Sequence, residues 1–249
     1  MGSPLIICVS GKKRSGKNAC SNHIAASFLK RNGSIKDFKI NKLGLLEARK
    51  NDHWFTVEEG EFNKTFNGTE VRLYSFADCL KEFCINVLGL TYEQCYGTED
   101  EKNSRTNLHW SKMPTYKDDG GSCVTEFDPM MTGREVLQYF GTDIVRKMCD
   151  NAWVNATINK IKKDNVKLAL ITDGRFVNEV ETVNGIGGKT IRLLRNVAGK
   201  DEHSSETVLD DYPRDRYSLV VDNRNMSVDE QCNFLAPYVN GWLDSLYGK

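Results

Sequence analysis

Short apolar runs alternate with longer segments of helical periodicity along most of the chain. The first run, Leu5–Val9, is apolar at every position, which is typical of a strand buried on both faces. Further strands are predicted at Val71–Phe76, Lys167–Thr172, Lys189–Leu194 and Tyr217–Val221. Strands that alternate with helices predict an α/β fold, in which a parallel sheet of about five strands is flanked by helices.

The helices between these strands carry apolar residues at helical spacing. Helices are predicted at about Lys17–Lys30, Cys79–Leu88, Asn151–Lys163 and Val177–Val183, the last of which ends in the glycine-rich turn Gly185–Gly188. Two further helices are predicted to begin with capping boxes, in which a Ser or Thr hydroxyl and a Glu carboxylate bond each other's backbone amides. These boxes are Thr132 with Glu135, which precedes the apolar stripe Val136, Leu137, Phe140 and Ile144, and Ser227 with Glu230.

Two stretches, 31–70 and 97–131, interrupt the strand–helix alternation and are rich in Gly, Asn, Lys, Asp and Thr. We interpret them as insertions in a single domain that spans residues 1–249. Within the first, the pairs Glu59-Gly60 and Asn67-Gly68 favour a small hairpin over residues 52–70. Insertions after the strand ends of an open α/β sheet lie where ligands bind, so both stretches are candidates for lid or substrate-binding segments.

Composition narrows the possible partners. The 249 residues include 34 Lys and Arg and 34 Asp and Glu, a balance that argues against a polybasic surface for nucleic-acid polymers or anionic membranes. No apolar run approaches the roughly 18 residues of a membrane span, and Met1–Pro4 shows no signal-peptide pattern, so we expect a cytoplasmic protein. The eight cysteines lack zinc-site spacing and are expected to be reduced thiols.

The segment between the first strand and its helix has the pattern of a phosphate-binding loop. Gly11-Lys12-Lys13-Arg14-Ser15-Gly16-Lys17 matches G-x-x-x-x-G-K in the strand–loop–helix context that the motif requires. Glycines allow the backbone to wrap a phosphate, and the amides at the helix N-terminus present positive dipoles to it. Lys17 is expected to reach the β- and γ-phosphates of a nucleotide, which predicts a sheet of the P-loop NTPase type.

One position departs from the usual loop. The Ser or Thr that normally follows the lysine and ligates Mg²⁺ is replaced by Asn18, and Ala19 comes next. An Asn carbonyl can bind Mg²⁺ directly or through water but lacks the charge of a carboxylate. Substitutes for the missing ligand could come from Ser15, Ser21, Asp78 or Asp173, so the metal ligands are not assigned.

Polar residues after two other strands favour a second anion site. Phe76–Lys81 and Thr172–Arg175 each run from a strand end toward a helix start, at the same edge of the sheet as the phosphate loop. Structural alternatives are open for each residue. Asp78 could cap a helix, Arg175 could form a salt bridge, Arg105 and Arg134 could be surface charges, and Trp153 could be a core residue.

In these motifs the sequence resembles the deoxynucleoside monophosphate kinases of tailed phages, within the wider group of P-loop nucleotide and phosphomevalonate kinases. The family loop G-x-K-R-S-G-K-D-T matches this chain except at Asn18 and Ala19. The other shared features are Leu80-Lys81, Arg105-Thr106-Asn107, Leu137-Gln138 with Phe140-Gly141-Thr142-Asp143, Trp153, Asp173-x-Arg175 with Glu179, and His203-x-Ser205-Glu206.

The resemblance implies roles for particular residues. The implied ATP-binding residues are those of the loop: Gly11, Lys13, Arg14, Ser15, Gly16, Lys17 and Asn18. The implied residues around a deoxynucleoside monophosphate (dNMP) are Lys13, Leu80, Lys81, Arg105, Arg134, Gly141, Thr142, Trp153, Asp173, Arg175 and Glu179. Lys17, Arg14 and Arg175 are the implied catalytic cations.

The implied reaction is transfer of the γ-phosphate of ATP to a dNMP, with Mg²⁺, to give ADP and dNDP. The expected setting is the cytoplasm, that of the host for a phage-encoded enzyme, and the family makes a homodimer a reasonable expectation. A lid is expected over residues 196–205. Two alternatives stay open: phosphorylation of another phosphomonoester such as phosphomevalonate, and a nucleotide-binding regulator without turnover, which Asn18 and Ala19 would suit.

Overall fold

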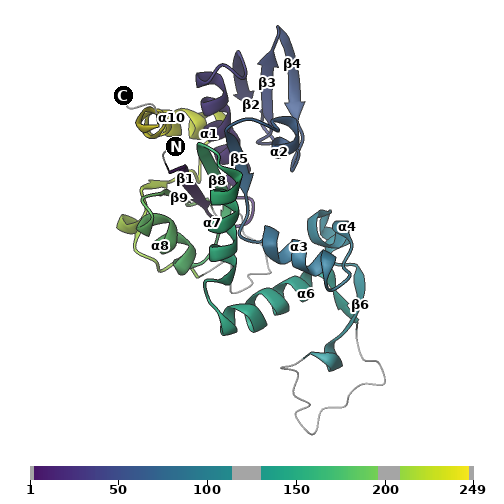
Figure 1. Cartoon of the computed structure of the whole chain (residues 1–249). Coiled ribbons are helices and arrows are strands. Elements are labelled where there is room, and N and C mark those ends of the chain that lie inside the picture. The colour runs from purple at the N-terminus through teal and green to yellow at the C-terminus, as the bar shows by residue number, and fades with distance from the viewer. Residues whose placement is uncertain (1–2, 114–129, 196–207, 247–249) are drawn as a thin grey trace. The chain divides into compact units, whose positions relative to one another are not determined.

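The computed structural model describes residues 3–113, 130–195 and 208–246 (Figure 1). The chain divides into two compact units. Unit 1 consists of Met1–Phe76 and Ala156–Lys249, and unit 2 of Ala77–Asn155. The second division falls inside helix α7 (Ala152–Asp164).

A five-stranded parallel sheet forms the centre of unit 1, as the sequence predicts. Its order is β10–β9–β1–β8–β5. The strands are β1 (Leu5–Ser10), β5 (Val71–Tyr74), β8 (Leu168–Gly174), β9 (Lys189–Leu193) and β10 (Leu219–Val221). Residues 6–10 of β1 are all buried, because β1 lies between two other strands and apolar side chains cover both faces.

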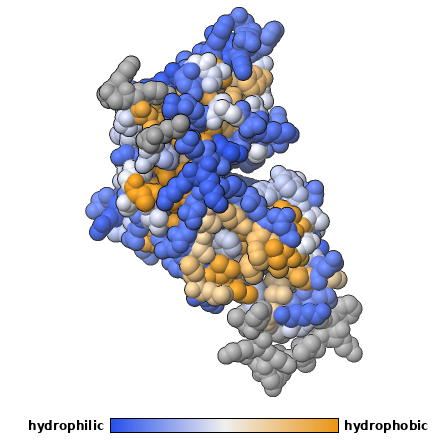
Figure 2. Space-filling model, in the orientation of Figure 1, coloured by the Kyte–Doolittle hydropathy of each residue, from blue (hydrophilic) through white to orange (hydrophobic). Residues whose placement is uncertain are grey.

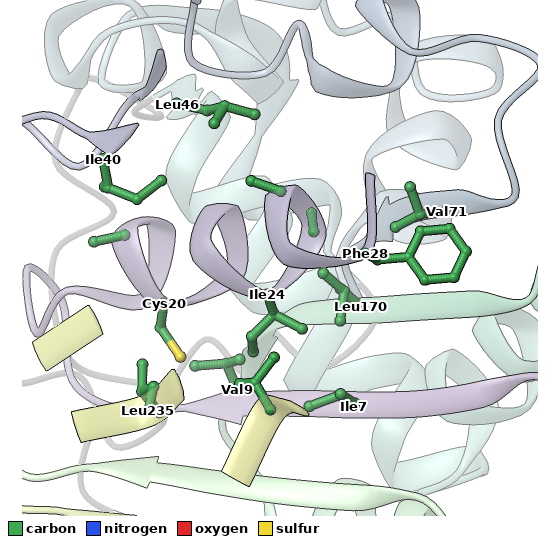
Figure 3. Packing of buried hydrophobic residues seen from close by; sticks show 14 of the residues in the cluster. Ile7, Val9, Cys20, Ile24, Phe28, Ile40, Leu46, Val71, Leu170 and Leu235 are labelled. Atoms are coloured by element: carbon green, nitrogen blue, oxygen red, sulfur yellow. The ribbon is translucent and has the colours of Figure 1, made fainter. Parts of the chain in front are cut away.

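Helices α1 (Lys17–Arg31), α8 (Val177–Gly185) and α10 (Val228–Ser245) belong to unit 1. In Figure 3, Ile24 of α1 lies among Val9 of β1 and Leu170 of β8, while Phe28 reaches toward Val71. These five side chains are at most 1% exposed. Burial of each such side chain stabilises the fold by about 1.5–3 kcal/mol, so the helix after the phosphate loop is firmly anchored on the sheet.

The first inserted stretch folds as a three-stranded antiparallel sheet, β2 (Asp37–Ile40), β3 (Leu46–Lys50) and β4 (His53–Val57), followed by α2 (Phe62–Thr65). A hairpin exists, but its predicted place within 52–70 is wrong. The turn is Asn51-Asp52, with φ of 49° and 64°, between the paired residues Lys50 and His53. Two consecutive left-handed residues are what a two-residue hairpin turn of the favoured twist requires, and Asn and Asp tolerate them.

Unit 2 is built from short elements around its own core. They are α3 (Asp78–Asn86), α4 (Tyr92–Tyr96), α5 (Glu99–Lys102), β6 (Arg105–His109), a 3₁₀ turn (Trp110–Lys112), β7 (Met130–Thr132) and α6 (Gly133–Gln138). A π-helix, Tyr139–Arg146, continues α6. The capping box at Thr132 is confirmed, as is the one at Ser227. The predicted α-helical stripe is only partly right: Val136 is buried in α6, whereas Phe140 and Ile144 lie partly buried in the π-helix.

Apolar side chains of unit 2 also reach its surface. Figure 2 shows a concentration of hydrophobic residues on one face of unit 2, in the region that α6 and the π-helix occupy in Figure 1. Partly buried side chains of this segment include Leu137, Phe140 and Ile144.

Among the described residues, every helix is too short or too polar to cross a membrane.

Candidate nucleotide-binding site

The segment between β1 and α1 has the backbone of an anion-binding loop. Arg14 and Gly16 adopt left-handed conformations, with φ of 62° and 94°. The amide of Ser15 donates to the carbonyl of Lys12 at 3.1 Å, which closes the loop on itself. Amides at a helix N-terminus next to left-handed residues form a concave surface that attracts phosphate oxygens.

The ammonium group of Lys17 lies on this loop. Its Nζ donates to the carbonyls of Gly11 and Lys12, at 2.7 Å in each case. These bonds hold the positive charge of Lys17 on the loop.

Two loop positions require glycine for different reasons. A Cβ atom on Gly11 would lie 2.4 Å from Oγ of Ser15, a side chain that is fully buried. A Cβ atom on Gly16 would meet Oε1 of Gln231 at 2.9 Å, in addition to the left-handed backbone. The loop is therefore packed closely against its own serine and against α10.

A cationic cavity of about 270 Å³ lies beside the loop. Its charged lining residues are Lys12, Arg192, Arg195, Asp210, Arg214 and Arg224. Asp210 bridges two of the cations, at 2.8 Å from Lys12 and 3.0 Å from Arg192. These residues are not among the predicted site residues, although Arg195 directly follows the predicted strand Lys189–Leu194, at the sheet edge where ligands bind in such folds.

Asn18 contacts the first inserted stretch. Its Nδ2 donates to Oε1 of Glu59 at 2.7 Å, and both side chains are exposed. Asn18 therefore uses its amide group toward a carboxylate 41 residues away in the sequence. Glu59 was not among the predicted site residues, because nothing in the local pattern connects a turn residue of the insertion with the loop.

The end of β8 contributes an acid that holds the start of the chain segment after β5. Oδ2 of Asp173 accepts a hydrogen bond from Oγ of Ser75 at 2.5 Å, and Oδ1 accepts one from the amide of Phe76 at 2.7 Å. Asp173 thus fixes the last residues of unit 1 before Ala77.

Glu179 caps the N-terminus of α8. Its Oε2 accepts the amide of Arg175 at 2.7 Å and that of Phe176 at 3.1 Å, and the residue is 1% exposed.

Burial, with added repulsion from Glu179 and Asp173, raises the pKa of the Cys8 thiol, so Cys8 stays a neutral thiol.

In unit 2, Leu80, Gly141 and Trp153 lie together. A Cβ on Gly141 would be 2.5 Å from Cδ2 of Leu80, and Nε1 of Trp153 donates to the Gly141 carbonyl at 3.1 Å. Gly141 and Thr142 lie in the π-helix, a conformation that is frequent at functional sites.

The remaining predicted residues of unit 2 are tied to neighbouring groups. Nζ of Lys81 lies 4.3 Å from the centroid of the Tyr96 ring. Arg134 forms an ion pair with Glu99 at 2.8 Å. Asp78 is the first residue of α3 and not its cap, since the N-cap is Ala77.

Arg105 lies on the two-stranded sheet of unit 2, where its guanidinium donates to the carbonyl of Met130.

The predicted lid, 196–205, and the His203 motif lie outside the described residues. Within unit 1, the structure places the phosphate loop, Asp173, Arg175 and Glu179 at the carboxyl ends of β1 and β8. The other predicted residues belong to unit 2.

Comparison with known proteins assigns the sequence to a family. A family model described as deoxynucleotide monophosphate kinase matches residues 5–230, from β1 into α10. The chain belongs to the deoxynucleotide monophosphate kinase family. It is also similar to a protein of Acanthamoeba polyphaga mimivirus described as a "Putative deoxynucleotide monophosphate kinase", with 30% identity over 169 residues, which cover 63% of this chain and 76% of the viral protein. The family resemblance drawn from the sequence motifs is confirmed.

Proposed function

We propose that this member of the deoxynucleotide monophosphate kinase family transfers the γ-phosphate of ATP to a dNMP, giving ADP and dNDP. The observation that carries the proposal is the phosphate loop itself: left-handed Arg14 and Gly16, the amides at the start of α1, and the ammonium of Lys17 held on the loop carbonyls. This arrangement suits the triphosphate of a nucleotide donor.

The residues that we propose for the acceptor are those that the family resemblance implies. Arg175, Lys81 and Arg105 are the cations proposed for the acceptor phosphate. Trp153 and Gly141 are proposed to pack against the nucleoside, with Leu80 and Thr142. Arg134 is the weakest member of this set, because its guanidinium is bonded to Glu99 and Asn103.

The oxygen donors near the loop fit a magnesium ion. Among the described residues, no three His, Cys, Asp or Glu side chains gather as a metal site. Mg²⁺ bound to nucleotides needs only one or two protein groups besides phosphates and water. Asn18 donates through Nδ2 to Glu59, so a carboxylate lies beside the position of the usual loop ligand, and a rotation of the Asn18 amide would turn its oxygen to the same side. We propose that Asn18 and Glu59 hold the ion, whose chemistry there is neutralisation of charge on the donor phosphates.

The proposed reaction needs no general base. The second pKa of a phosphate monoester is about 6, so at pH 7 the acceptor is already largely the dianionic nucleophile. The main barrier is repulsion between two polyanions. Lys17 and Arg14 on the donor, with Arg175 on the acceptor, would offset that repulsion and position the reacting groups.

The experiment is a coupled assay of ADP release, with Mg-ATP and a panel of dNMPs, ribonucleoside monophosphates and phosphomevalonate. Transfer to one or more dNMPs is expected. Transfer only to phosphomevalonate, or ATP binding with no transfer to any acceptor, would overturn the proposal in favour of one of the alternatives from the sequence.

A further inference from the structure

Two buried carboxamides, Asn223 and Gln231, contact the outer side of the phosphate loop. Asn223 is two residues beyond the end of β10, and Gln231 lies in the first turns of α10. They are 0% and 2% exposed. Buried amides are costly unless they are hydrogen-bonded, so the partners that they use indicate their role.

The carboxamide of Asn223 is fully used. Its Nδ2 donates to the carbonyl of Ser15 at 2.8 Å and to Oε1 of Gln231 at 2.6 Å. Its Oδ1 accepts the amide of Arg195 at 2.8 Å. Gln231 in turn donates from Nε2 to the carbonyl of Gly16 at 3.2 Å. The two side chains therefore hold two successive carbonyls of the loop and are linked to each other.

These bonds help to fix which way the loop amides face, together with the amide of Cys20, which also donates to the carbonyl of Gly16 at 3.1 Å. In a trans peptide the carbonyl of one residue points opposite to the N–H of the next. Because the carbonyls of Ser15 and Gly16 face the two carboxamides, the amides of Gly16 and Lys17 face the opposite side. Gly16 is the N-cap of α1 and Lys17 its first residue, so both amides belong to the anion-binding surface at the start of the helix.

Asn223 also holds a wall of the cationic cavity. The guanidinium of Arg195 donates to the carbonyl of Asn223, through Nε at 3.0 Å and Nη2 at 2.8 Å, and to the carbonyl of Met226. Arg195 lines the cavity together with Lys12 of the loop. The Asn223 side chain thus connects the loop and α10 with the backbone of Arg195. The main-chain carbonyl of Asn223 holds the guanidinium of Arg195 at the cavity wall.

We propose that Asn223 and Gln231 are positioning residues for the donor triphosphate: they turn the amides of Gly16 and Lys17 toward the phosphates and fix Arg195 beside the same loop. The inference rests on the proposed use of the loop for ATP. It does not depend on which acceptor receives the phosphate.

The test compares Asn223→Ala and Gln231→Met with the control Asn225→Ala, a change at an exposed residue close by. The measured quantities are the Kd of Mg-ATP by calorimetry on the full chain, KM for ATP and for the acceptor, and the melting temperature. We expect both buried variants to weaken ATP binding about tenfold or more, as loss of one or two hydrogen bonds predicts. KM for the acceptor should stay within about twofold, and the control should match the parent.

The double variant Asn223→Ala/Gln231→Met should have a Kd for Mg-ATP close to that of the single variant with the lower affinity. The reason is that the two side chains form one linked unit, so their effects are not additive. Folded single variants that bind ATP within about twofold of the parent would overturn the proposal, as would loss of a melting transition in both, which indicates a purely structural role. If only Asn223→Ala fails to fold, the Kd of Mg-ATP for Gln231→Met alone tests the proposal. A parent that binds ATP but phosphorylates no dNMP refutes the proposed function and leaves this comparison intact, whereas a parent that binds no ATP refutes both.

Discussion

Nδ2 of Asn18 lies 2.7 Å from Oε1 of Glu59, so a carboxylate from the inserted sheet segment reaches the first turn of α1. In the usual loop this turn carries a hydroxyl that binds Mg²⁺. The chain keeps the loop glycines and lysine but lacks that hydroxyl, and under the proposed function the carboxylate of Glu59 takes its place as the negative oxygen donor.

Glu59→Gln removes that negative charge and keeps the size of the side chain. We expect the Mg²⁺ concentration at half-maximal ATP binding to rise several-fold, because a neutral amide is a weaker magnesium ligand than a carboxylate. Calorimetric ATP titrations over a Mg²⁺ series measure this without turnover. Glu58→Gln, at the adjacent exposed position, is the matched control. Equal Mg²⁺ dependence in both variants would mean that Glu59 does not hold the ion.

Lys17→Ala removes the ammonium that bonds the loop carbonyls. Turnover should fall by about 10²–10³, the size of effect seen when one stabilising donor to a developing charge is lost. Stability should change little, since Lys17 is only partly buried. Initial rates and thermal unfolding measure the two effects, with the exposed Lys42→Ala as control. Retained activity in Lys17→Ala would remove this residue from the mechanism.

Trp153→Phe deletes the Nε1 donor to the Gly141 carbonyl and keeps an aromatic ring. If these residues shape the nucleoside site, KM for the dNMP rises several-fold while KM for ATP stays the same. Steady-state kinetics with each substrate varied in turn gives both values. Trp54→Phe, on the exposed face of the small sheet, should alter neither. A change confined to KM for ATP would contradict the assignment.

Glu179→Ala leaves the amides of Arg175 and Phe176 without their buried acceptor. The free energy of unfolding should fall by about 1–3 kcal/mol, as expected when a buried hydrogen-bond partner is lost. Urea denaturation measures it, and the exposed Glu181→Ala is the control. Unchanged stability with a large rise in KM for the dNMP would instead indicate a direct contact between Glu179 and substrate.

His23 makes the fold sensitive to acid. Burial in α1 lowers the pKa of His23 from 6.5 to about 4. Between these values the unfolded chain binds a proton that the folded chain excludes, so stability is lost as the pH falls from about 6.5 toward 4. Relative to His23→Gln, the loss should reach about 3 kcal/mol. Unfolding free energies at several pH values test this, and parallel pH profiles in the two proteins would contradict it.

The amino-acid sequence is enough to predict the alternation of strands and helices around the parallel sheet, and the phosphate loop, but not the strands of the inserted stretches. The alternation and the loop depend on local signals: a continuously apolar strand, glycines and a lysine at fixed spacing, and capping boxes whose two members are three residues apart. The helices at Thr132 and Ser227 begin where those boxes predict, because both partners of the cap lie within one turn.

Which distant groups meet around the loop depends on the folded chain. Asn18 bonds Glu59, and Ser15 bonds Asn223, which lies 208 residues away in sequence. No local pattern encodes such pairs, because they depend on how the strands are ordered in the sheet and how the insertion folds back on α1. The position of the hairpin turn depends on tertiary packing in the same way. Leu46 and Val57 are paired across the two strands and both are buried, and this pairing puts the turn at Asn51-Asp52 and not at the glycines farther along the chain.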